Sequence, residues 1–312
     1  MKYIKSFYEL SKNSTSIAGG KGASLGEMTH AGLPVPPGFV VLASAFELFL
    51  EGTDLAVEIE AALKKTSQKD INSIDRASAQ IRAMILEQNM PKDIATEILA
   101  HHKKLKAKFV AVRSSATAED SKVASWAGEL ETYLNVTEKD VIKSVMKCWS
   151  SLFTPRAIFY RFEKKLHKQK VSVAVVIQKM AQSEVSGVCF TVHPVTKDRN
   201  QMVIEAGFGL GESIVGGLIT PDTYVIHKGD FSIIDINVSE QTIAIVKSPR
   251  GNLHKKLSAA QGGKQKLTGR QIIELAKICK KIEQHYKHPQ DIEWAYEKGK
   301  FYITQSRPIT TL

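Results

Sequence analysis

The stretch Asp291-Ile-Glu-Trp-Ala-Tyr-Glu-Lys-Gly-Lys-Phe-Tyr-Ile-Thr-Gln-Ser-Arg-Pro308 alternates in polarity on both sides of Glu297-Lys-Gly299. Alternation with a period of two residues is typical of a half-buried β-strand, and a short glycine-containing break between two such runs predicts a β-hairpin. Gly299 can take the positive φ that a three-residue turn requires. One face of this hairpin is expected to be a core face, formed by Ile292, Trp294, Tyr296 and Tyr302.

The opposite face of the predicted hairpin is polar. In the register that the three-residue turn implies, Asp291 lies opposite Gln305, and Glu293 and Arg307 share their face. Two carboxylates, an amide and a guanidinium on one face suit a metal–nucleotide site. The alternative is a solvated face whose opposite charges only pair with each other, since cross-strand charge pairs are common.

Length and composition predict a globular protein. At 312 residues, with 43% apolar and 24% charged residues, the chain is expected to form one large two-lobed module or two domains. No apolar run approaches the ~18 residues of a membrane span, and the first residues are too mixed for a signal peptide. Three cysteines far apart in the sequence exclude a Cys-only zinc site and indicate reduced thiols in the cytoplasm; they are Cys148, Cys189 and Cys279.

The formal net charge is +11, and part of it is concentrated in residues 247–270, which contain no Asp or Glu. Several glycines in this stretch predict a flexible, solvated basic loop. The alternative is a docking surface for an acidic partner. Readers of single-stranded nucleic acid interleave cations with aromatic rings, and this stretch has no aromatic residue, so nucleic-acid binding is not favoured.

The N-terminal part of the chain predicts one anion site and a helical region. After a short strand at about residues 3–7, Gly19-Gly-Lys-Gly22 places Lys21 at the entrance of a short helix, where a helix N-terminus favours anions. Residues 44–107 have helical periodicity and offer no chemistry. The pair His101-His102 in this region is expected to be a solvated helix end. A final amphipathic helix over residues 268–286, with Thr268 as its cap, leads into the hairpin.

Two buried strands in the middle of the chain end in polar residues. The first delivers Arg113 at its carboxyl end into a Ser/Thr-rich loop, where open α/β sheets collect ligands. Either a phosphate or a structural ion pair with Glu119 or Asp120 would satisfy Arg113. The second, over residues 171–178, ends in Gln178, whose amide would need a partner such as an adenine edge.

Between these strands lies a run of small residues around Gly128. Such a loop is suited to closing its backbone amides over phosphates, and Thr132 is expected to follow it on the next strand. Farther on, Gly207-Phe-Gly-Leu-Gly211 predicts a junction between a strand and a helix. It does not match the dinucleotide fingerprint, which needs a different glycine spacing.

Taken together and in this order, these features resemble the nucleotide-binding module of the phosphoenolpyruvate synthase (pyruvate, water dikinase) and pyruvate, phosphate dikinase family. Rifampicin phosphotransferase carries the same module. The resemblance extends from about residue 19 to residue 308. Its most specific segments are Gly-Gly-Lys-Gly-Ala-Ser-Leu-Gly-Glu-Met (19–28), Val-Arg-Ser-Ser-Ala-Thr-Ala-Glu-Asp (112–120), Phe-Gly-Leu-Gly-Glu (208–212) and Gln-Ser-Arg-Pro-Ile-Thr (305–310).

The resemblance implies an α/β (α+β) fold of the ATP-grasp type, with two lobes that hold ATP–Mg in the cleft between them. The whole chain, residues 1–312, would be a single such module. Residues 44–107 would form a helical insert, and residues 268–308 a C-terminal helix plus β-hairpin.

The resemblance also implies roles for particular residues. Phosphates would be bound by three basic residues with catalytic roles, namely Lys21, Arg113 and Arg307. The closing loop and strand that contact ATP would include Gly128 and Thr132, and Gln178 would lie near the base. Mg²⁺ and phosphate oxygens would be held by Glu293 and Gln305, with Asp291 as a supporting carboxylate. This donor set fits the preference of Mg²⁺ for oxygen.

In the family, the β-phosphoryl group of ATP passes to a histidine on a swivelling domain and then to pyruvate or the antibiotic. No Ser-His-Ala-type segment is present here. We therefore expect a chain that provides the ATP-binding part of the reaction and needs a phosphohistidine-carrying domain or subunit as its partner, with no membrane partner. The alternatives are the ATP-binding domain of an antibiotic kinase and a nucleotide-binding regulatory protein without turnover.

Overall fold

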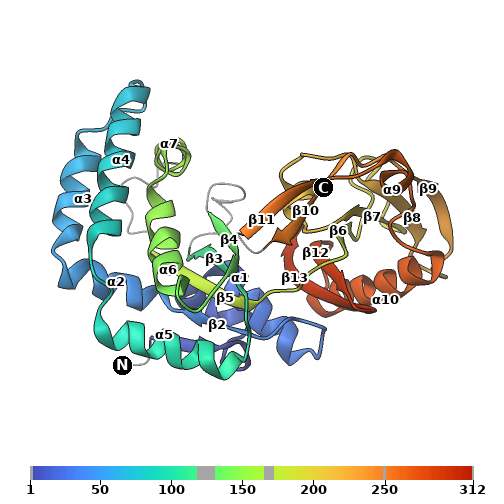
Figure 1. Ribbon diagram of the computed structural model, residues 1–312, viewed down its shortest axis with the longest axis horizontal. Helices are drawn as coiled ribbons and strands as arrows, with labels where there is room; N and C mark the ends of the chain where they lie inside the picture. The colour runs from blue at the N-terminus through green and yellow to red at the C-terminus, as the bar shows by residue number, and fades with distance from the viewer. Residues whose placement is uncertain (1–2, 118–130, 165–171, 249–250, 311–312) are drawn as a thin grey trace. The chain divides into compact units, whose positions relative to one another are not determined.

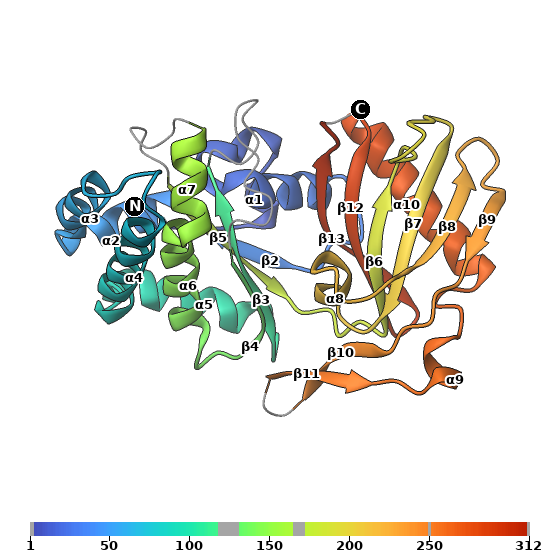
Figure 2. The same cartoon turned by 90° about the horizontal axis from the view of Figure 1, so that it is seen from above.

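The computed structural model describes residues 3–117, 131–164, 172–248 and 251–310. The chain divides into two compact units (Figures 1 and 2). Unit 1 comprises Met1–Glu27 and Pro37–Met180, and unit 2 comprises Met28–Pro36 and Ala181–Leu312. Both contain antiparallel sheets and helices, so the α+β class is confirmed.

Unit 1 is built on an antiparallel sheet with the strand order β1-β2-β5-β3-β4 in the described residues. Its strands are β1 (Ile4–Ser6), β2 (Gly38–Val41), β3 (Val110–Ala116), β4 (Thr132–Val136) and β5 (Val173–Lys179). Its helices are α1 (Thr15–His30, which continues into unit 2), α2 (Ala43–Gly52), α3 (Leu55–Lys64), α4 (Ile71–Glu87), α5 (Lys92–Leu105), α6 (Val141–Ser150) and α7 (Pro155–Glu163), with short 3-10 turns at Phe7–Glu9, Lys12–Ser14 and Ser151–Phe153.

The core of unit 1 lies on one face of this sheet. Trp149 is completely buried there, with its ring 5.5 Å from Phe46 and 5.0 Å from Phe49. The helical region predicted for residues 44–107 is confirmed as α2 to α5. Because neighbouring strand residues point to opposite faces, Val112 and Ile177 contribute to this core while the residues beside them face away from it.

One histidine of this region is buried, although it was predicted to be exposed to solvent. The predicted helix end around His101 and His102 was expected to be solvated, but His102 is only 4% exposed. Helix α5 turns this side chain inward, and neither ring nitrogen has a hydrogen-bond partner among the described residues. His102 is polar and precedes Lys103 and Lys104, so the local sequence does not indicate that its side chain lies on the core face of the helix.

Unit 2 contains a larger antiparallel sheet with the order β13-β12-β6-β7-β8-β9, and a two-stranded sheet β10-β11, in the described residues. The large sheet consists of β6 (Val185–Phe190), β7 (Gln201–Phe208), β8 (Asp222–His227), β9 (Ile233–Asn237), β12 (Gln290–Glu297) and β13 (Lys300–Pro308). The remaining elements are β10 (Ile243–Ser248), β11 (Gly251–Lys256), α8 (Glu212–Val215), α9 (Ala259–Gly262) and α10 (Gly269–Tyr286).

Helix α10 covers one face of the large sheet (Figure 2). It begins where the sequence predicts, because the hydroxyl of Thr268 accepts a hydrogen bond from the N–H of Gln271. The helix buries Ile272, Leu275 and Ile282, and the strand beneath it buries Ile292 and Trp294. These two strand residues therefore belong to the core face, as predicted.

The terminal hairpin exists, but its turn and register differ from the prediction. Glu297 pairs with Lys300, so the turn has two residues, Lys298 and Gly299, with φ of 50° and 79°. Positive φ at both positions is typical of a type I′ turn, whose twist matches that of the strands. A bulge between Glu293 and Trp294 adds a further shift of one residue, so Asp291 lies opposite Arg307 and not opposite Gln305.

The prediction for Tyr302 is also wrong. The two-residue turn shifts the pairing beside it by one residue from the predicted register, so Trp294 pairs with Ile303 and Tyr302 lies opposite Ala295. A one-residue slip moves a side chain to the other face of a sheet, which places Tyr302 opposite the core face. Phe301 takes the core position, packed edge-on against Trp294 at 5.7 Å.

The basic stretch 247–270 is not the flexible loop that its composition predicts. Its described residues include strand β11, helix α9 and the first residues of α10. Lys266 is buried and bonded to Asp222, a carboxylate 44 residues earlier in the chain. Local composition cannot reveal a partner at that distance, which is why the stretch reads as unpaired. In the part of the chain that the structure describes, no helix is long and apolar enough to cross a membrane.

Candidate functional site

Lys21 lies just after a break in helix α1. Gly19 has φ 67° and ψ 173°, which no helix contains, and the helix resumes after it. The N–H of Gly22 points to the hydroxyl of Ser115 on β3 at 3.4 Å. The glycines thus let the helix start lie directly on the sheet, two residues from Arg113 along β3, and the sequence placed Lys21 correctly at a helix entrance.

Gly19→Ala is expected to lower the free energy of unfolding more than Gly32→Ala does. Both glycines have positive φ, 67° and 68°, so each alanine costs ~1–2 kcal/mol for its backbone conformation. A methyl group at Gly19 would also lie 2.2 Å from the Ser115 hydroxyl, whereas one at Gly32 meets nothing within 4 Å. Urea denaturation measures both losses, and equal losses would contradict the close packing of α1 on β3.

Arg113 and Thr132 are direct neighbours across two strands. Arg113 pairs with Thr132 on β4 and with Val176 on β5, so the side chains of all three lie on one face of the sheet. The guanidinium-bearing residue is only 8% exposed, while Thr132 is exposed. Arg113 sits in the middle of β3 and not at its carboxyl end, because the strand continues through Ser114 and Ser115 to Ala116.

Gln178 lies on the same face as Arg113. It pairs with Ala111 on β3 and with Gly38 on β2, and Ala111 is two residues from Arg113. The Gln178 side chain is 2% exposed. The polar face of unit 1 therefore carries Arg113, Thr132 and Gln178. The part of helix α1 that begins near Lys21 lies on the same face.

Glu131 is a nearby polar residue that the sequence analysis missed. Its carboxylate forms an ion pair of 2.8 Å with Arg82 on α4 and accepts a hydrogen bond from the Tyr133 hydroxyl. Its backbone carbonyl accepts from the Ser114 hydroxyl at 2.9 Å. These contacts hold the start of β4 and hence Thr132 against β3. Arg82 comes from a helix that showed only a core periodicity, so no local signal linked the two.

The buried thiol of Cys148 lies close enough to Lys21 and Glu131 for both charges to affect its pKa. Burial raises the pKa of Cys148 to about 12; the Ser114 hydroxyl and the Lys21 ammonium oppose the shift, while Glu131 adds to it. Lys21 therefore acts electrostatically on the centre of unit 1. Gly128 and the two alternative partners of Arg113, Glu119 and Asp120, lie outside the described residues.

In unit 2 the charged hairpin face is assembled by direct cross-strand pairs. Arg307 contacts the Asp291 carboxylate through Nη2 at 2.7 Å and through Nε at 2.8 Å. Burial raises the pKa of Asp291, the guanidinium of Arg307 opposes that shift, and Glu293 adds to it. Asp291 thus orients Arg307, which remains 46% exposed on the same face.

Glu293 and Gln305 form the next pair along this face. The two-residue error in the predicted register does not disturb the grouping, because a shift of two keeps every side chain on its own face. A carboxylate and an amide oxygen fit Mg²⁺, which is usually bound through one or two carboxylates with substrate phosphates and water completing the shell. No cluster of three or more His, Cys, Asp or Glu placed to hold a metal occurs in the described residues.

Glu205 on β7 is a second residue that the sequence analysis missed. Val188 on β6 pairs with both Glu293 and Glu205, so the three residues form a row across one face of the sheet. Burial raises the pKa of Glu205, and the Asp291 charge raises it further. A glutamate inside the apolar run 201–206 was the available signal, but the strand order needed to use it is not in the sequence.

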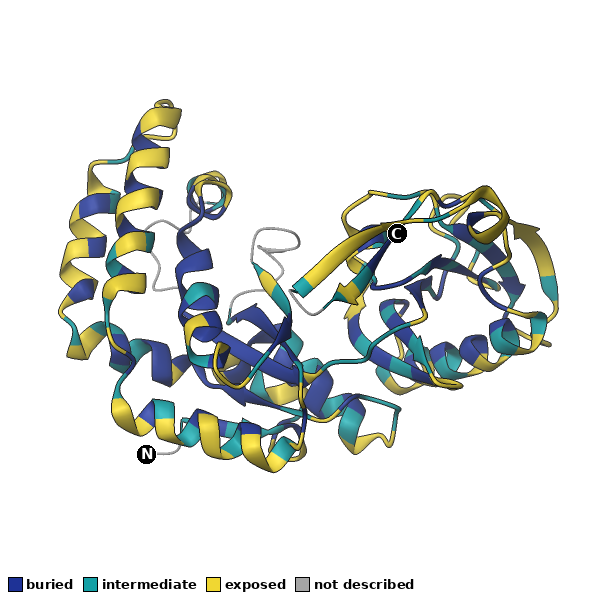
Figure 3. Cartoon of the chain, in the orientation of Figure 1, coloured by how far each residue is buried: buried dark blue, intermediate teal, exposed yellow. Residues whose placement is uncertain are grey.

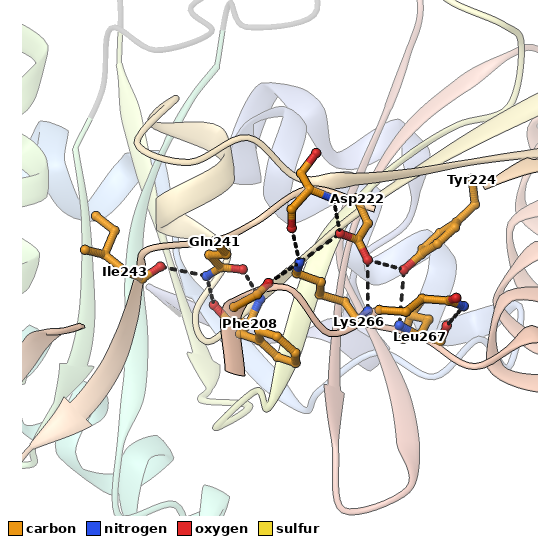
Figure 4. A network of polar contacts seen from close by, with 10 residues as sticks. Phe208, Asp222, Tyr224, Gln241, Ile243, Lys266 and Leu267 are labelled. Carbon is orange, nitrogen blue, oxygen red and sulfur yellow. Dashed lines mark hydrogen bonds and ion pairs between the residues drawn. The ribbon is translucent and has the colours of Figure 1, made fainter. Parts of the chain in front are cut away.

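The glycine-rich segment after β7 is held by hydrogen bonds on several sides. The side chain of Gln241 accepts from the Phe208 N–H at 2.8 Å and donates to its carbonyl at 2.9 Å, as a neighbouring strand would (Figure 4). The Gly209 carbonyl accepts from the hydroxyls of Ser183 and Ser186. This motif is therefore a rigid junction leading into α8.

A buried ion pair supports this junction (Figure 4). The Lys266 ammonium lies 2.8 Å from the Asp222 carboxylate, both side chains are 0% exposed, and the ammonium lies 5.3 Å from the Phe208 ring centre. Asp222 also accepts from the Tyr224 hydroxyl at 2.8 Å. Burial and this bond raise the pKa of Tyr224, so the phenol remains a donor.

The sequence of the chain matches a known family over almost its entire length. The model of the family described as "Pyruvate phosphate dikinase, AMP/ATP-binding domain" matches residues 15–312. This range includes all eight residues of the predicted site, namely Lys21, Arg113, Gly128, Thr132, Gln178, Glu293, Gln305 and Arg307.

Curated relatives agree with this match. The chain is 47% identical over 321 residues to a probable phosphoenolpyruvate synthase of Methanocaldococcus jannaschii, covering 100% of this chain and 27% of the relative. It is 44% identical over 359 residues to the phosphoenolpyruvate synthase of Pyrococcus furiosus, covering 100% and 44%. It is 37% identical over 313 residues to the rifampicin phosphotransferase of Bacillus subtilis, covering 99% and 36%. The chain spans less than half the length of these relatives.

Proposed function

The chain belongs to the family of the pyruvate phosphate dikinase AMP/ATP-binding domain, and we propose on this basis that it is the ATP-binding module of a phosphoenolpyruvate synthase-like dikinase. It would bind ATP–Mg and pass the β-phosphoryl group to a histidine on a separate domain or subunit, and ultimately to pyruvate. The observation that carries the proposal is the pairing of Glu293 with Gln305 beside the Asp291–Arg307 ion pair.

In this proposal the fold is of the ATP-grasp type, whose two lobes hold one ATP–Mg. Lys21 and Arg113 bind phosphate oxygens from unit 1, where Thr132 is the exposed neighbour of Arg113. Gln178 recognises the base, and Gly128 belongs to the closing loop. In unit 2 the residues that face the phosphates are Glu293, Gln305 and Arg307.

The chemistry is that of phosphoryl transfer, in which positioning and charge neutralisation lower the barrier. Bound Mg²⁺ would neutralise phosphate charge and be held by Glu293 and Gln305. Arg307 contributes donors in a fixed orientation because Asp291 holds it by two contacts. The acceptor histidine must come from another domain or chain, and the greater length of the relatives supports this.

A second candidate is the ATP-binding domain of an antibiotic kinase. The match to rifampicin phosphotransferase over 99% of the chain favours it specifically. Both candidates use the same ATP chemistry and differ in the final acceptor of the phosphoryl group. A regulatory protein that binds ATP without turnover is the third possibility, and the same experiment separates it from the other two.

We expect label from β-labelled ATP to appear on the phosphohistidine domain of a relative when that domain and Mg²⁺ are added to this chain. ATP–Mg alone should raise the Tm of the chain, because a ligand that binds the folded state stabilises it. A Tm shift without labelled histidine would indicate the regulatory alternative. A Tm that does not change when ATP–Mg is added would contradict ATP binding itself.

A further inference from the structure

Two of the three cysteines of the chain lie in the core of unit 2, one on each side of the boundary between helix α10 and the large sheet. Cys189 belongs to β6 and Cys279 belongs to α10. Both residues are 0% exposed. They are far apart in the sequence, so only the folded chain brings them to the same layer.

The side chain of Cys189 points to the face of the sheet that α10 covers. Cys189 pairs with Ile204 on β7 and with Ile292 on β12, and directly paired residues share a face of an antiparallel sheet. Ile204 and Ile292 are both 0% exposed. The next row of the sheet carries Glu205 and Glu293 on the opposite, polar face. Cys189 therefore belongs to the apolar layer beneath the helix.

Cys279 lies on the side of α10 that faces this layer. Buried and exposed residues alternate along the helix (Figure 3), and the buried ones include Leu275, Cys279 and Ile282. Their spacing of four and three residues keeps the side chains on one face of a helix. The helix and the sheet thus each direct one thiol into the same apolar layer.

The two thiols are in contact. Burial raises the pKa of Cys189, and a hydrogen bond with the Cys279 thiol and the charges of Asp291 and Glu283 raise it further. The third cysteine has different surroundings: Cys148 belongs to unit 1, and its thiol donates to the carbonyl of Val112 at 3.6 Å. The chain therefore contains one adjacent pair of thiols and one separate buried thiol.

We propose that Cys189 and Cys279 form a reversible disulfide that ties α10 to β6 when the chain meets a disulfide oxidant such as oxidised glutathione. In the first exchange Cys279 attacks one sulfur of oxidised glutathione, and one reduced glutathione leaves. In the second exchange Cys189 attacks the Cys279 sulfur of the mixed disulfide, and the second reduced glutathione leaves. The cysteines lose two electrons and two protons, and glutathione disulfide gains both.

Burial makes the first exchange slow in the closed fold, because glutathione reaches Cys279 only when α10 opens locally. The packing then favours the second exchange. A glutathione adduct is too large for a close-packed layer between helix and sheet, whereas an internal disulfide joins two side chains that already touch. Its formation requires the two Sγ atoms to approach to about 2.0 Å.

The disulfide would close a long loop that contains strands β7 to β11, helices α8 and α9 and the first part of α10. Closing such a loop restricts the unfolded chain and so stabilises the folded one. We expect the oxidised chain to have a Tm roughly 5–10 °C above that of the reduced chain. This expectation does not depend on the ATP function proposed above.

Refolding of the 312-residue chain from urea in a glutathione redox buffer tests the pairing, because the thiols are accessible in the unfolded chain. Three cysteines allow three pairings, and exchange lets the folded structure select among them. We expect mass spectrometry of non-reduced peptides to find Cys189 bonded to Cys279 and no bond to Cys148. Dithiothreitol should remove the bond. The native chain incubated with oxidised glutathione should form the same bond more slowly, so the test does not depend on refolding.

Alanine variants provide the controls. Cys189→Ala and Cys279→Ala should each abolish the disulfide and the difference in Tm between the oxidised and reduced chains. Cys148→Ala is the matched control, because Cys148 is equally buried but belongs to unit 1, and it should preserve both. Comparing the oxidised and reduced forms of each variant separates the disulfide from any packing lost with the thiol.

Three results would overturn the proposal. Three free thiols after both treatments would show that the pair only fills the core, as buried cysteines commonly do. A disulfide that includes Cys148 would show that the contact between the other two thiols does not direct the pairing. A bond between Cys189 and Cys279 that leaves the Tm unchanged would show that it does not tie the helix to the sheet.

Discussion

Asp222→Asn is expected to lower the free energy of unfolding by about 3–5 kcal/mol, because it leaves the buried Lys266 ammonium without its counter-charge. Both side chains are 0% exposed. The ammonium also donates to the carbonyls of Ser239 and Gly262, which cannot replace a carboxylate. Urea denaturation followed by circular dichroism measures the loss.

Two further variants make this prediction specific. The double variant Asp222→Asn/Lys266→Met should recover most of the lost stability, because removing both charges also removes the cost of burying them. Glu60→Gln is the matched control: Glu60 pairs with Lys64 at 2.7 Å on an exposed helix face, and exposed pairs contribute little. An Asp222→Asn variant as stable as the parent chain would contradict the buried pair.

We expect Asp222→Asn to destabilise the glycine-rich junction after β7 as well. Lys266 connects the segment before α10 with Asp222 at the start of β8, and its ammonium lies over the Phe208 ring. Gln241, whose N–H bonds the Gly262 carbonyl, links the same segment to Phe208. One lysine of the basic stretch, Lys266, is thus used inside the fold.

The second large effect is expected at Arg113. Arg113→Ala should weaken ATP–Mg binding more than tenfold, since a hydrogen bond to a charged group is worth ~1.5–3 kcal/mol. Arg113→Lys should recover only part of the affinity, because lysine keeps the charge but not the two-pronged geometry. Isothermal titration calorimetry measures the three dissociation constants.

Two controls separate this effect from a general loss of fold or charge. Arg76→Ala removes a guanidinium that is 74% exposed on α4 and should leave ATP affinity unchanged. Glu293→Ala should weaken binding in the presence of Mg²⁺ but not binding of ATP with the metal chelated. Unaltered affinity in Arg113→Ala, with the Tm of the free protein preserved, would exclude Arg113 from the phosphate site.

Much of the candidate site follows from local patterns. Alternation within each strand, combined with the predicted turn, places Asp291, Glu293, Gln305 and Arg307 on one face. The grouping holds because the shorter turn and the bulge together shift the register by two residues. Ile292 and Trp294 occupy the core face for the same reason. Thr268 caps α10 because its hydroxyl bonds a backbone N–H only three residues away.

Other parts could not be predicted because their causes are distant in the sequence. The two-residue turn reverses the predicted face of Tyr302, and the bulge after Glu293 brings Gln305 and Arg307 back to the face of Glu293. Glu205 joins the Glu293 row only because β6 lies between β7 and β12. Glu131 and Arg82 meet across 49 residues.

By itself, the sequence determined which residues alternate, where helices begin and which family the chain resembles, because these properties depend on neighbours within a few positions. Only the tertiary structure decided the antiparallel strand order, the hairpin register, the burial of Lys266 and the contact of Cys189 with Cys279. Each of these depends on which distant strand, helix or charge is brought alongside. The hairpin face at residues 291–307 illustrates both causes. The two-residue strand period determines which of its residues share a face, and the packing of the sheet determines which residues pair with each other.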